Sequence, residues 1–240
     1  MQKFVIITSG RSGSYHLVDL LSSHKNIVCF GELFNKRGIG FWDEKLNSSE
    51  EILLFRNKNP IKFLNKVILR DYPKEKEIFG FKLLYSQIQK PILKYLKKKK
   101  WKVIHLKRRN LLKQFISNKK AIVMNKWSDY NNDDIQIYNK IKINVNSTQF
   151  LKKCKSILKS QKKIDKIFKS NQLMEVFYEN LCIDSETEMR KIQEFLEVKY
   201  KKLKPKQKKI NKVKISETIL NYTELKKQFI KTKYNIFFED

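Results

Sequence analysis

The stretch VIITSGRSGSYHLVDLL, residues 5–21, places a strand, a loop and a helix in direct succession. Aliphatic and β-branched residues come first, a loop rich in Ser and Gly follows, and the helix carries Leu17, Leu20 and Leu21 on one face. A helix that begins in this way directs unsatisfied backbone N–H groups and the positive end of its dipole toward the loop. We therefore expect the loop to bind an anion such as phosphate, with an ordinary strand-to-helix turn as the alternative.

The loop differs from the phosphate-binding loop of nucleoside triphosphatases, which follows the pattern GxxxxGK[ST]. In this chain Ser14 follows Gly13 directly, and the nearby cation is Arg11, which precedes that glycine. Gly10 and Gly13 permit a tight turn and a close approach of a ligand to the backbone. The residues that we expect to contact the anion are Arg11, Ser12, Gly13, Ser14 and Tyr15.

Strand-like and helix-like segments alternate along the chain. Apolar and β-branched runs predict strands at residues 4–8, 26–30, 78–85, 101–106 and 173–178. Helical periodicity predicts helices at residues 15–23, 51–71, 91–100, 110–117 and 147–170. This alternation predicts an α/β fold with a mainly parallel sheet of about five strands, in which ligands bind beyond the carboxyl ends of the strands. With no internal repeat and no linker, we expect residues 1–240 to form one domain.

The charge of the chain is strongly positive, +29, from 53 Lys and Arg against 24 Asp and Glu. Such a field attracts nucleic acid, an anionic membrane or a polyanionic small molecule. Because the excess is mostly lysine, and Asn and Ile are also frequent, AT-rich coding alone is an alternative cause. Only basic residues at motif positions are therefore counted as functional.

Cysteine usage and hydropathy indicate the compartment. Cys29, Cys154 and Cys182 lack paired spacing, which fits a reducing compartment, and none stands at zinc-ligand spacing with a histidine. No apolar run approaches the ~20 residues that span a bilayer, and strand residues begin at Phe4, which leaves no room for a signal peptide. We expect a cytoplasmic protein, with contact at the inner face of the membrane as a further expectation.

Two motifs carry a family resemblance. RSGSYHL (residues 11–17) resembles the 5′-phosphosulfate loop of sulfotransferases that use 3′-phosphoadenosine-5′-phosphosulfate (PAPS). HLKRRNLLKQFIS (residues 105–117) resembles the 3′-phosphate motif of the same family, in which an Arg at a strand end is followed eight residues later by a Ser on the next helix. Arg109 and Ser117 meet that spacing. A ribose 3′-phosphate is a dianion, which suits a guanidinium fork and a hydroxyl donor.

Further segments follow in the family's order. FGELF (residues 30–34) resembles the glutamate-bearing segment of carbohydrate and tyrosylprotein sulfotransferases, and Glu32 stands 21 residues after Arg11. FYENLCID (residues 177–184) resembles a segment whose tyrosine, here Tyr178, approaches the adenine. KKINKVKISETILNYTEL (residues 208–225) resembles a late stretch of bacterial glycan sulfotransferases, and Lys209 would lie in a basic loop, residues 199–214, that closes over the cofactor. The resemblance covers residues 4–35, 78–117, 173–200 and 208–240.

The resemblance implies a three-layer fold like that of P-loop NTPases, and this sequence departs from the family pattern at a few positions. Tyr15 replaces the usual Thr, and Ile210 stands where bacterial relatives often carry a polar residue. The cytosolic branch uses a histidine base on its third strand, and GFKLLY (residues 80–85) has none. We expect His105 to lie in the core.

The resemblance implies sulfuryl transfer without a metal. Arg11 and the loop amides would take the charge of the departing 5′-phosphate, and Glu32 would remove the proton of the acceptor hydroxyl. The alternative for Glu32 is a loop carboxylate that pairs with a nearby lysine. Lys82 would neutralise the sulfuryl oxygens, or is a solvated lysine at a strand end. The acceptor would be a glycan or glycolipid, selected by residues 36–75 and 118–170.

Other functions are kept open. A small-molecule kinase would share the fold, but it would bind ATP and need Mg²⁺ and an acidic metal ligand. A non-enzymatic binder of nucleic acid or membranes would use the lysine runs at residues 97–100 and 199–214 and would show steep salt dependence. An inactive relative of the family is a third alternative. Because neither charge nor fold alone explains the ordered motifs, we expect PAPS as the partner and no nucleic acid.

Overall fold

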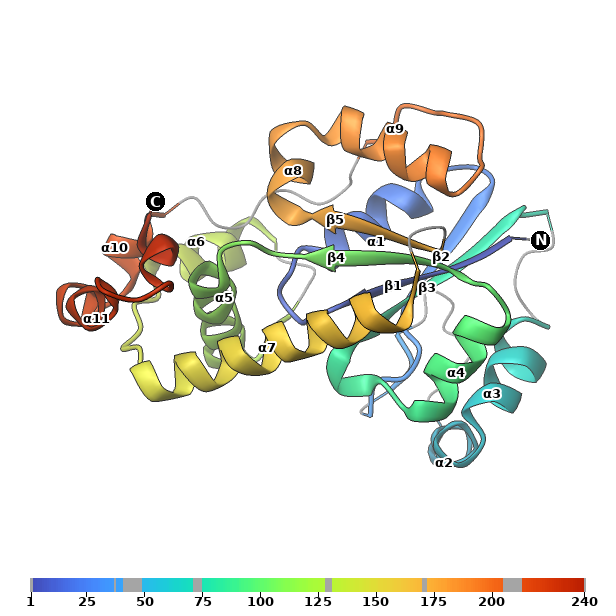
Figure 1. Cartoon of the computed structure of the whole chain (residues 1–240), viewed down its shortest axis with the longest axis horizontal. Helices are drawn as coiled ribbons and strands as arrows, with labels where there is room; N and C mark the ends of the chain where they lie inside the picture. The colour runs from blue at the N-terminus through green and yellow to red at the C-terminus, as the bar shows by residue number, and fades with distance from the viewer. Residues whose placement is uncertain are drawn as a thin grey trace. The chain divides into compact units, whose positions relative to one another are not determined.

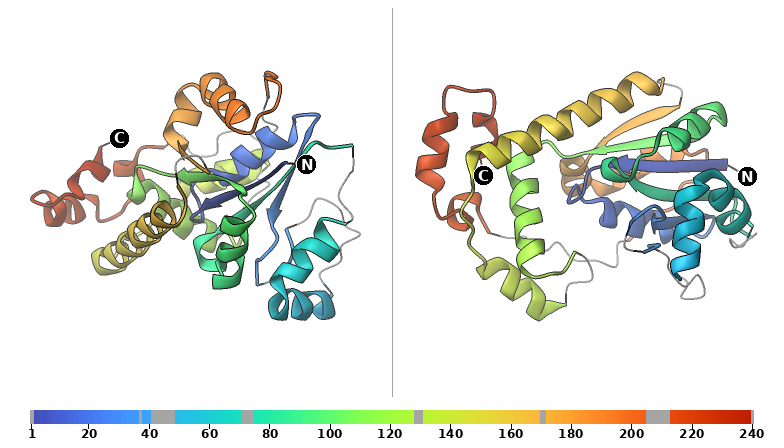
Figure 2. Two further views of the ribbon diagram at one scale, coloured as in Figure 1. Left: turned by 45° about the vertical axis from the view of Figure 1, so that its right-hand side comes forward. Right: turned by 90° about the horizontal axis from the view of Figure 1, so that it is seen from below.

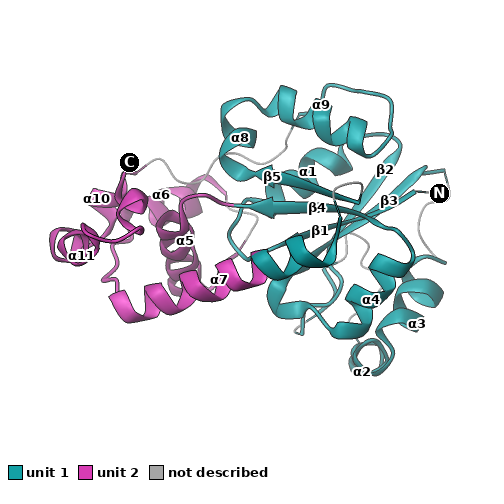
Figure 3. Ribbon diagram, viewed as in Figure 1, with its two compact units in different colours: residues 1–107, 162–206 teal, residues 108–161, 207–240 magenta. Residues whose placement is uncertain are grey.

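The computed structural model describes residues 2–36, 38–40, 49–70, 75–127, 131–169, 172–204 and 213–239. The chain forms two compact units, shown in Figure 3. Unit 1 comprises Met1–Lys107 and Lys162–Lys206, and unit 2 comprises Arg108–Gln161 and Gln207–Asp240. The single-domain interpretation stays a prediction.

Unit 1 contains a parallel β-sheet. Its strands are β1 (Gln2–Thr8), β2 (Ile27–Glu32), β3 (Ile78–Leu84), β4 (Lys102–Lys107) and β5 (Leu173–Phe177). Within the described residues they pair in the order β2-β3-β1-β4-β5, and every pair is parallel (Figure 1). Each predicted strand is present, to within a few residues at its ends. The predicted α/β fold with a parallel sheet is confirmed.

The helices of unit 1 are α1 (Ser14–Ser22), α2 (Glu50–Lys58), α3 (Pro60–Phe63), α4 (Lys90–Lys98), α8 (Tyr178–Ile183) and α9 (Ser185–Phe195), with a π-helical segment η1 (Leu64–Ile68) and a 3₁₀ turn η2 (Tyr85–Gln87). Unit 2 contains α5 (Leu111–Val123), α6 (Asn132–Lys140), α10 (Ile215–Thr218), α11 (Tyr222–Phe229) and a 3₁₀ turn η3 (Asn235–Phe238). Helix α7 (Ser147–Ile167) begins in unit 2 and ends in unit 1. Among the described residues, no helix is long and apolar enough to cross a membrane.

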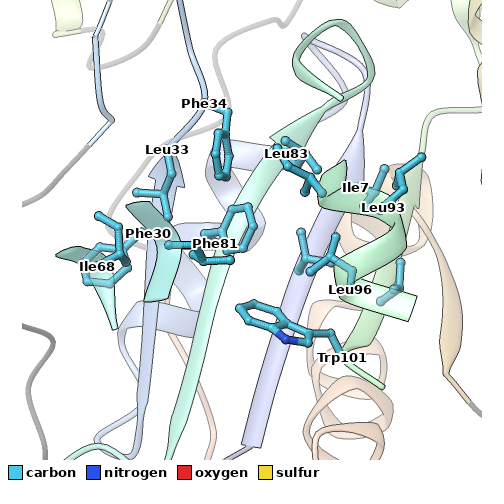
Figure 4. Close-up of a cluster of buried hydrophobic side chains, with 14 of the residues drawn as sticks. Ile7, Phe30, Leu33, Phe34, Ile68, Phe81, Leu83, Leu93, Leu96 and Trp101 are labelled. Atoms are coloured by element: carbon cyan, nitrogen blue, oxygen red, sulfur yellow. The ribbon is translucent and has the colours of Figure 1, made fainter. Parts of the chain in front are cut away.

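Helices cover both faces of the sheet, which gives the expected three layers. One face packs against α3, α4 and the last turn of α7. At its aromatic centre, Phe79 and Phe81 contact Trp101 edge-on at centroid distances of 6.0 and 5.7 Å; Figure 4 shows Phe81 beside Trp101. The other face is covered by α1, α8 and α9 (Figure 2), which pack on it through residues such as Leu17 and Ile192. Because alternate residues of a strand point to opposite faces, each buried strand needs apolar residues on both sides.

The prediction of one continuous helix over residues 51–71 is wrong. Helix α2 ends at Lys58, α3 begins at Pro60, and η1 follows with π-helical hydrogen bonding. Asn59 between α2 and α3 has φ −131° and ψ 60°, outside the helical region. A proline disfavours helical geometry in the residue before it, so the break follows from Pro60.

Unit 2 has an aromatic core of its own. Phe150 of α7 contacts the rings of Phe115, Phe229 and Phe237 with centroids 5.6, 5.6 and 6.3 Å apart. The segment before α7 pairs with the segment after α10 through an isolated parallel bridge between Ile143 and Ile219. Residues that are distant in the sequence thereby form one small core.

The close approach of β3 to the Phe4 ring generates a stability prediction. A Cβ atom on Gly80 would lie 2.1 Å from the Phe4 ring, whereas one on Gly10 would meet no atom within 4 Å. Gly80→Ala should destabilise the protein by about 1–3 kcal/mol, the usual cost of overpacking a core. Gly10→Ala should change the free energy of unfolding by only about a few tenths of a kcal/mol. Urea unfolding of both variants checks this, and equal stabilities would contradict it.

Candidate active site

The loop between β1 and α1 is held to the sheet by hydroxyl groups. Thr8 Oγ1 donates to the carbonyl oxygen of Leu106 at 2.7 Å and lies 2.6 Å from Ser12 Oγ. Ser12 Oγ also donates to the carbonyl oxygen of Ser9 at 2.9 Å, and its side chain is fully buried. The Ser12 hydroxyl therefore ties the loop to the end of β1, while Thr8 makes the contact with β4. What Ser12 can offer a ligand is its backbone N–H.

The backbone of this loop has an unusual alternation. Arg11 has φ 62° and Gly13 has φ 81°, and Ser12 between them is outside the positive-φ region. Alternation of this kind turns successive N–H groups toward one concavity, which is a common anion-binding arrangement. A non-glycine residue in the left-handed region costs about 1–2 kcal/mol, and such strain gathers at functional loops.

Helix α1 adds donors to this concavity. Gly13 is its N-cap and supplies no side-chain hydrogen bond, and the first intrahelical bond runs from Leu17 N to Gly13 O at 3.2 Å. The N–H groups of Ser14, Tyr15 and His16 thus have no intrahelical acceptor. The first turn contains no acidic residue that would occupy its positive end. The loop and helix together fit a phosphate group.

Tyr178, the first residue of α8, lies against this loop. A Cβ atom on Gly13 would stand 2.0 Å from Tyr178 Cδ2, so the ring occupies the space that any other residue at position 13 would need. Gly13 is therefore required twice, for its positive φ and for this close contact. The structure thereby brings a predicted adenine-binding residue to the predicted phosphate loop.

A buried ion pair joins Glu32 and Lys82. Lys82 Nζ lies 3.0 Å from Glu32 Oε1, and the two side chains are 1% and 17% exposed. The ammonium group also lies 3.8 Å from the centroid of the Tyr15 ring, in cation–π contact. Lys82 is thus a buried lysine and not a solvated one at a strand end, and Glu32 does pair with a lysine.

The second oxygen of Glu32 accepts hydrogen bonds from two amides. Asn35 Nδ2 and Gln87 Nε2 lie 3.1 and 2.5 Å from Glu32 Oε2. An ionised carboxylate has about four lone-pair positions. The two amide contacts and the contact with Lys82 use three of them. Glu32 can therefore stay in the ion pair and still accept one further hydrogen bond, such as one from a substrate hydroxyl.

The segment that follows Glu32 is fixed by a buried arginine. Arg56 is fully buried, and its Nη1 donates to the carbonyl oxygens of Leu33 and Gly38 at 3.2 Å each. Burial lowers the pKa of Arg56. Gly40 N donates to Glu32 O at 2.9 Å, which closes the segment back onto the end of β2. Sequence reasoning missed Arg56, Asn35 and Gln87, because no local pattern marks them.

A second polar network crosses the opposite face of the sheet. His105 is fully buried, its Nδ1 lies 2.8 Å from Asp165 Oδ1, and its Nε2 lies 2.6 Å from the Tyr85 hydroxyl. Lys107 Nζ donates to Asp165 Oδ2 at 2.9 Å and pairs with Glu175. His105 is buried as expected, but its partners were missed, because Asp165 is distant in the sequence.

The pKa values in this network follow from burial and charge. Burial, and then the charge of Lys107, lower the pKa of His105 to about 4, against the raising effect of Asp165. Burial alone would raise the pKa of Asp165, but hydrogen bonds from Lys107 and His105 hold it below its usual value. Burial and the nearby charges of Asp165 and Glu175 raise the pKa of Tyr85. At neutral pH His105 is neutral and Asp165 is ionised.

Unit 2 contains the other predicted site residues. Arg109 is exposed and precedes Asn110, the N-cap of α5, whose side chain accepts from Lys113 N at 2.8 Å. Ser117 lies further along α5 and accepts a hydrogen bond from the Tyr138 hydroxyl at 3.1 Å. One turn later Lys120 is buried, donates to Tyr138 O at 3.0 Å, and has its pKa lowered to about 8 by burial. Lys209 lies outside the described residues.

Comparisons with known proteins indicate a family. A model of the sulfotransferase domain matches residues 1–239. A sulfotransferase from Alicyclobacillus acidocaldarius is similar in structure, with a TM-score of 0.58 and 15% identity over 96% of this chain and 92% of that one. The structure of mouse sulfotransferase SULT7A1 complexed with PAP is similar with a TM-score of 0.47 and 15% identity. The match covers 84% of this chain and 60% of the mouse chain. Among curated proteins none matches.

The lowered pKa of His105 generates a prediction of pH-dependent stability. Its folded pKa of about 4 lies below the ordinary histidine pKa of ~6.5, so the unfolded chain takes up the proton first as the pH falls. The stabilising contribution is full above pH ~6.5 and is lost toward pH 4. Between pH 7.5 and 4.5 the wild type should lose about 2 kcal/mol more stability than His105→Gln. Urea unfolding at both pH values checks this, and equal losses would contradict it.

Proposed function

The chain belongs to the sulfotransferase-domain family, and on that premise we propose that it transfers a sulfuryl group from PAPS to a hydroxyl of a glycan or glycolipid. One observation carries the proposal. Tyr15 belongs to the phosphate-binding turn through its backbone, and its ring covers Lys82, which pairs with Glu32. A site for a leaving phosphate and a carboxylate that can accept a proton thus belong to one contact network.

The reaction is a substitution at sulfur with a loose, in-line transition state, like phosphoryl transfer. The bond from sulfur to the acceptor oxygen forms as the bond to the 5′-phosphate oxygen breaks, and the electron pair leaves with the phosphate. Arg11 and the N–H groups of residues 12–15 stabilise the charge that grows on that phosphate. Lys82 neutralises the sulfuryl oxygens, and Glu32 takes the proton of the acceptor hydroxyl.

The donor is proposed to contact several further residues. Arg109 and Ser117 would bind the 3′-phosphate of the donor, because a guanidinium group and a hydroxyl suit a dianion. Tyr178 would lie beside the adenine, and Lys209 would cover the bound nucleotide. PAP, the molecule bound in the mouse structure, has the abbreviation of adenosine 3′,5′-bisphosphate, which is the product expected of this reaction. Since basic side chains and backbone N–H groups supply the positive charge, no metal is required.

The acceptor class is proposed from the resemblance to the bacterial branch. Lysines on α7, including Lys152, Lys155 and Lys159, are exposed and would suit an anionic glycan. A cytoplasmic location, with contact at the inner face of the membrane, belongs to the same proposal, because glycolipid precursors would be met there.

Nucleotide binding tests the donor assignment. Calorimetry of the wild type should give tight binding of PAP and none of ATP, and tight ATP binding would favour a kinase. Arg109→Ala should weaken the binding of PAP by about ten- to a hundredfold and leave the binding of 5′-AMP unchanged, since only PAP has the 3′-phosphate. Arg11→Ala should weaken the binding of both nucleotides. Arg190→Ala, which removes the same charge from an exposed position of α9, is the control. Equal losses of PAP and 5′-AMP in Arg109→Ala would refute the 3′-phosphate assignment.

Steady-state kinetics test the base. Glu32→Gln keeps the shape of the side chain and removes its basicity, so kcat should fall about 10²–10⁴-fold while PAP binding stays within a factor of about three. Glu51→Gln, an exposed change on α2, should leave both quantities unchanged. Wild-type turnover in Glu32→Gln would show that another group accepts the proton.

A further inference from the structure

The ammonium group of Lys82 is enclosed in this structure. Its side chain is 1% exposed, Glu32 Oε1 lies 3.0 Å from Nζ, and the centroid of the Tyr15 ring lies 3.8 Å from it. The proposed function nevertheless requires Lys82 to neutralise the sulfuryl oxygens of the donor. Because Lys82 belongs to β3 inside the sheet, these oxygens can reach the ammonium group only if Glu32 or Tyr15 gives way.

The two groups that cover Lys82 differ in how firmly they are held. Glu32 Oε2 accepts hydrogen bonds from the side-chain amides of Asn35 and Gln87, so the carboxylate is fixed from its other side. Tyr15 is 38% exposed, and within the described part of the chain its hydroxyl makes no hydrogen bond. Exposed side chains change rotamer on the picosecond-to-nanosecond timescale. The Tyr15 ring is therefore the cover that can move.

A single residue connects the predicted phosphate site to Lys82. The backbone N–H of Tyr15 lies in the first turn of α1, and its ring lies on the ammonium group. In PAPS the sulfuryl group extends from the 5′-phosphate through one bridging oxygen. For in-line transfer the sulfuryl group must point toward the acceptor hydroxyl, and therefore toward Glu32, which is 17% exposed and pairs with Lys82. The sulfuryl oxygens and the Tyr15 ring then need the same place beside the ammonium group.

We propose that Tyr15 determines donor specificity: its ring and the sulfuryl group of PAPS compete for the ammonium group of Lys82, whereas PAP, which lacks the sulfuryl group, leaves the ring in place. The inference rests on the proposed function and adds a role for this tyrosine, since a Thr at this position would have no ring to place over the lysine. Binding of PAPS exchanges a cation–π contact for a charge-assisted contact. Because PAP makes no such exchange, the lost contact reduces the affinity for PAPS alone.

Calorimetry without an acceptor tests the competition, because the donor is then not consumed. The dissociation constants of PAPS and PAP are measured for the wild type and for Tyr15→Ala, which removes the ring. The ratio of the Kd of PAP to the Kd of PAPS should rise about three- to thirtyfold in Tyr15→Ala, the scale of one cation–π contact. The ratio cancels any change in the phosphate-binding turn that affects both ligands equally. An unchanged or lower ratio overturns the inference.

Two further variants show whether the ring over Lys82 is responsible. Tyr15→Phe keeps the aromatic face and removes only the hydroxyl, so its ratio should equal that of the wild type. Tyr200→Ala removes a ring whose centroid lies 4.0 Å from Cζ of Arg190, a contact of the same kind in another part of unit 1. It should also leave the ratio unchanged. A rise in either variant as large as that in Tyr15→Ala would contradict competition at Lys82.

NMR spectra of the ¹³C-lysine-labelled chain follow the ring itself. Protons above an aromatic face are shifted upfield, so the Lys82 methylene next to Nζ should give an upfield signal that is missing in Tyr15→Ala. Saturating PAPS should return this signal to the ordinary lysine range, and saturating PAP should leave it upfield. A signal that stays upfield with PAPS bound overturns this inference alone. If the wild type binds neither PAPS nor PAP, the proposed function fails and this inference fails with it.

Discussion

The buried ammonium group of Lys82 is the constraint on which the candidate site depends. A cation that is 1% exposed is stable only when a counter-charge and further polar contacts replace water, and loss of the partner of a buried charge costs about 3–5 kcal/mol. Glu32 supplies the charge and Tyr15 supplies a π face. The irregular pairing between Phe30 and Glu32 on β2 sets the carboxylate opposite Lys82 on β3. The need to neutralise one lysine thus places the candidate base.

The same constraint links the base to the sheet topology. In the order β2-β3-β1-β4-β5, β1 lies between β3, which carries Lys82, and β4, which anchors the loop through Leu106. Because the pairs are parallel, the ends of β1, β2 and β3 lie at the same edge of the sheet. The predicted phosphate-binding loop follows β1, the η2 turn follows β3, and Glu32 is the last residue of β2. The fold therefore gathers segments from distant parts of the sequence without any local signal for their contact.

The difference between local sequence signals and contacts made only by the fold explains what the sequence could and could not predict. The strands and the loop at Gly13 follow from local periodicity and from glycine, and the break at Pro60 was readable from the proline itself. The partners of Glu32 could not be predicted, since Gln87, 55 residues later in the chain, reaches Glu32 from the turn after β3. Asp165 likewise reaches His105 from α7. A lone Asn, Gln or Asp carries no pattern, and only the register of the strands decides which of them meet.

The ion pair also bears on how the proposed base would work. When Glu32 takes a proton it becomes neutral, and Lys82 loses its counter-charge while it remains buried. The Tyr15 ring offsets part of that loss, but a full negative charge must come from elsewhere. Under the proposed function the sulfuryl oxygens of the donor supply it. Proton abstraction is then favourable only when the donor is bound. Tyr15, which stands in place of the family's usual Thr and covers Lys82, would thus help to couple the base to the presence of the donor.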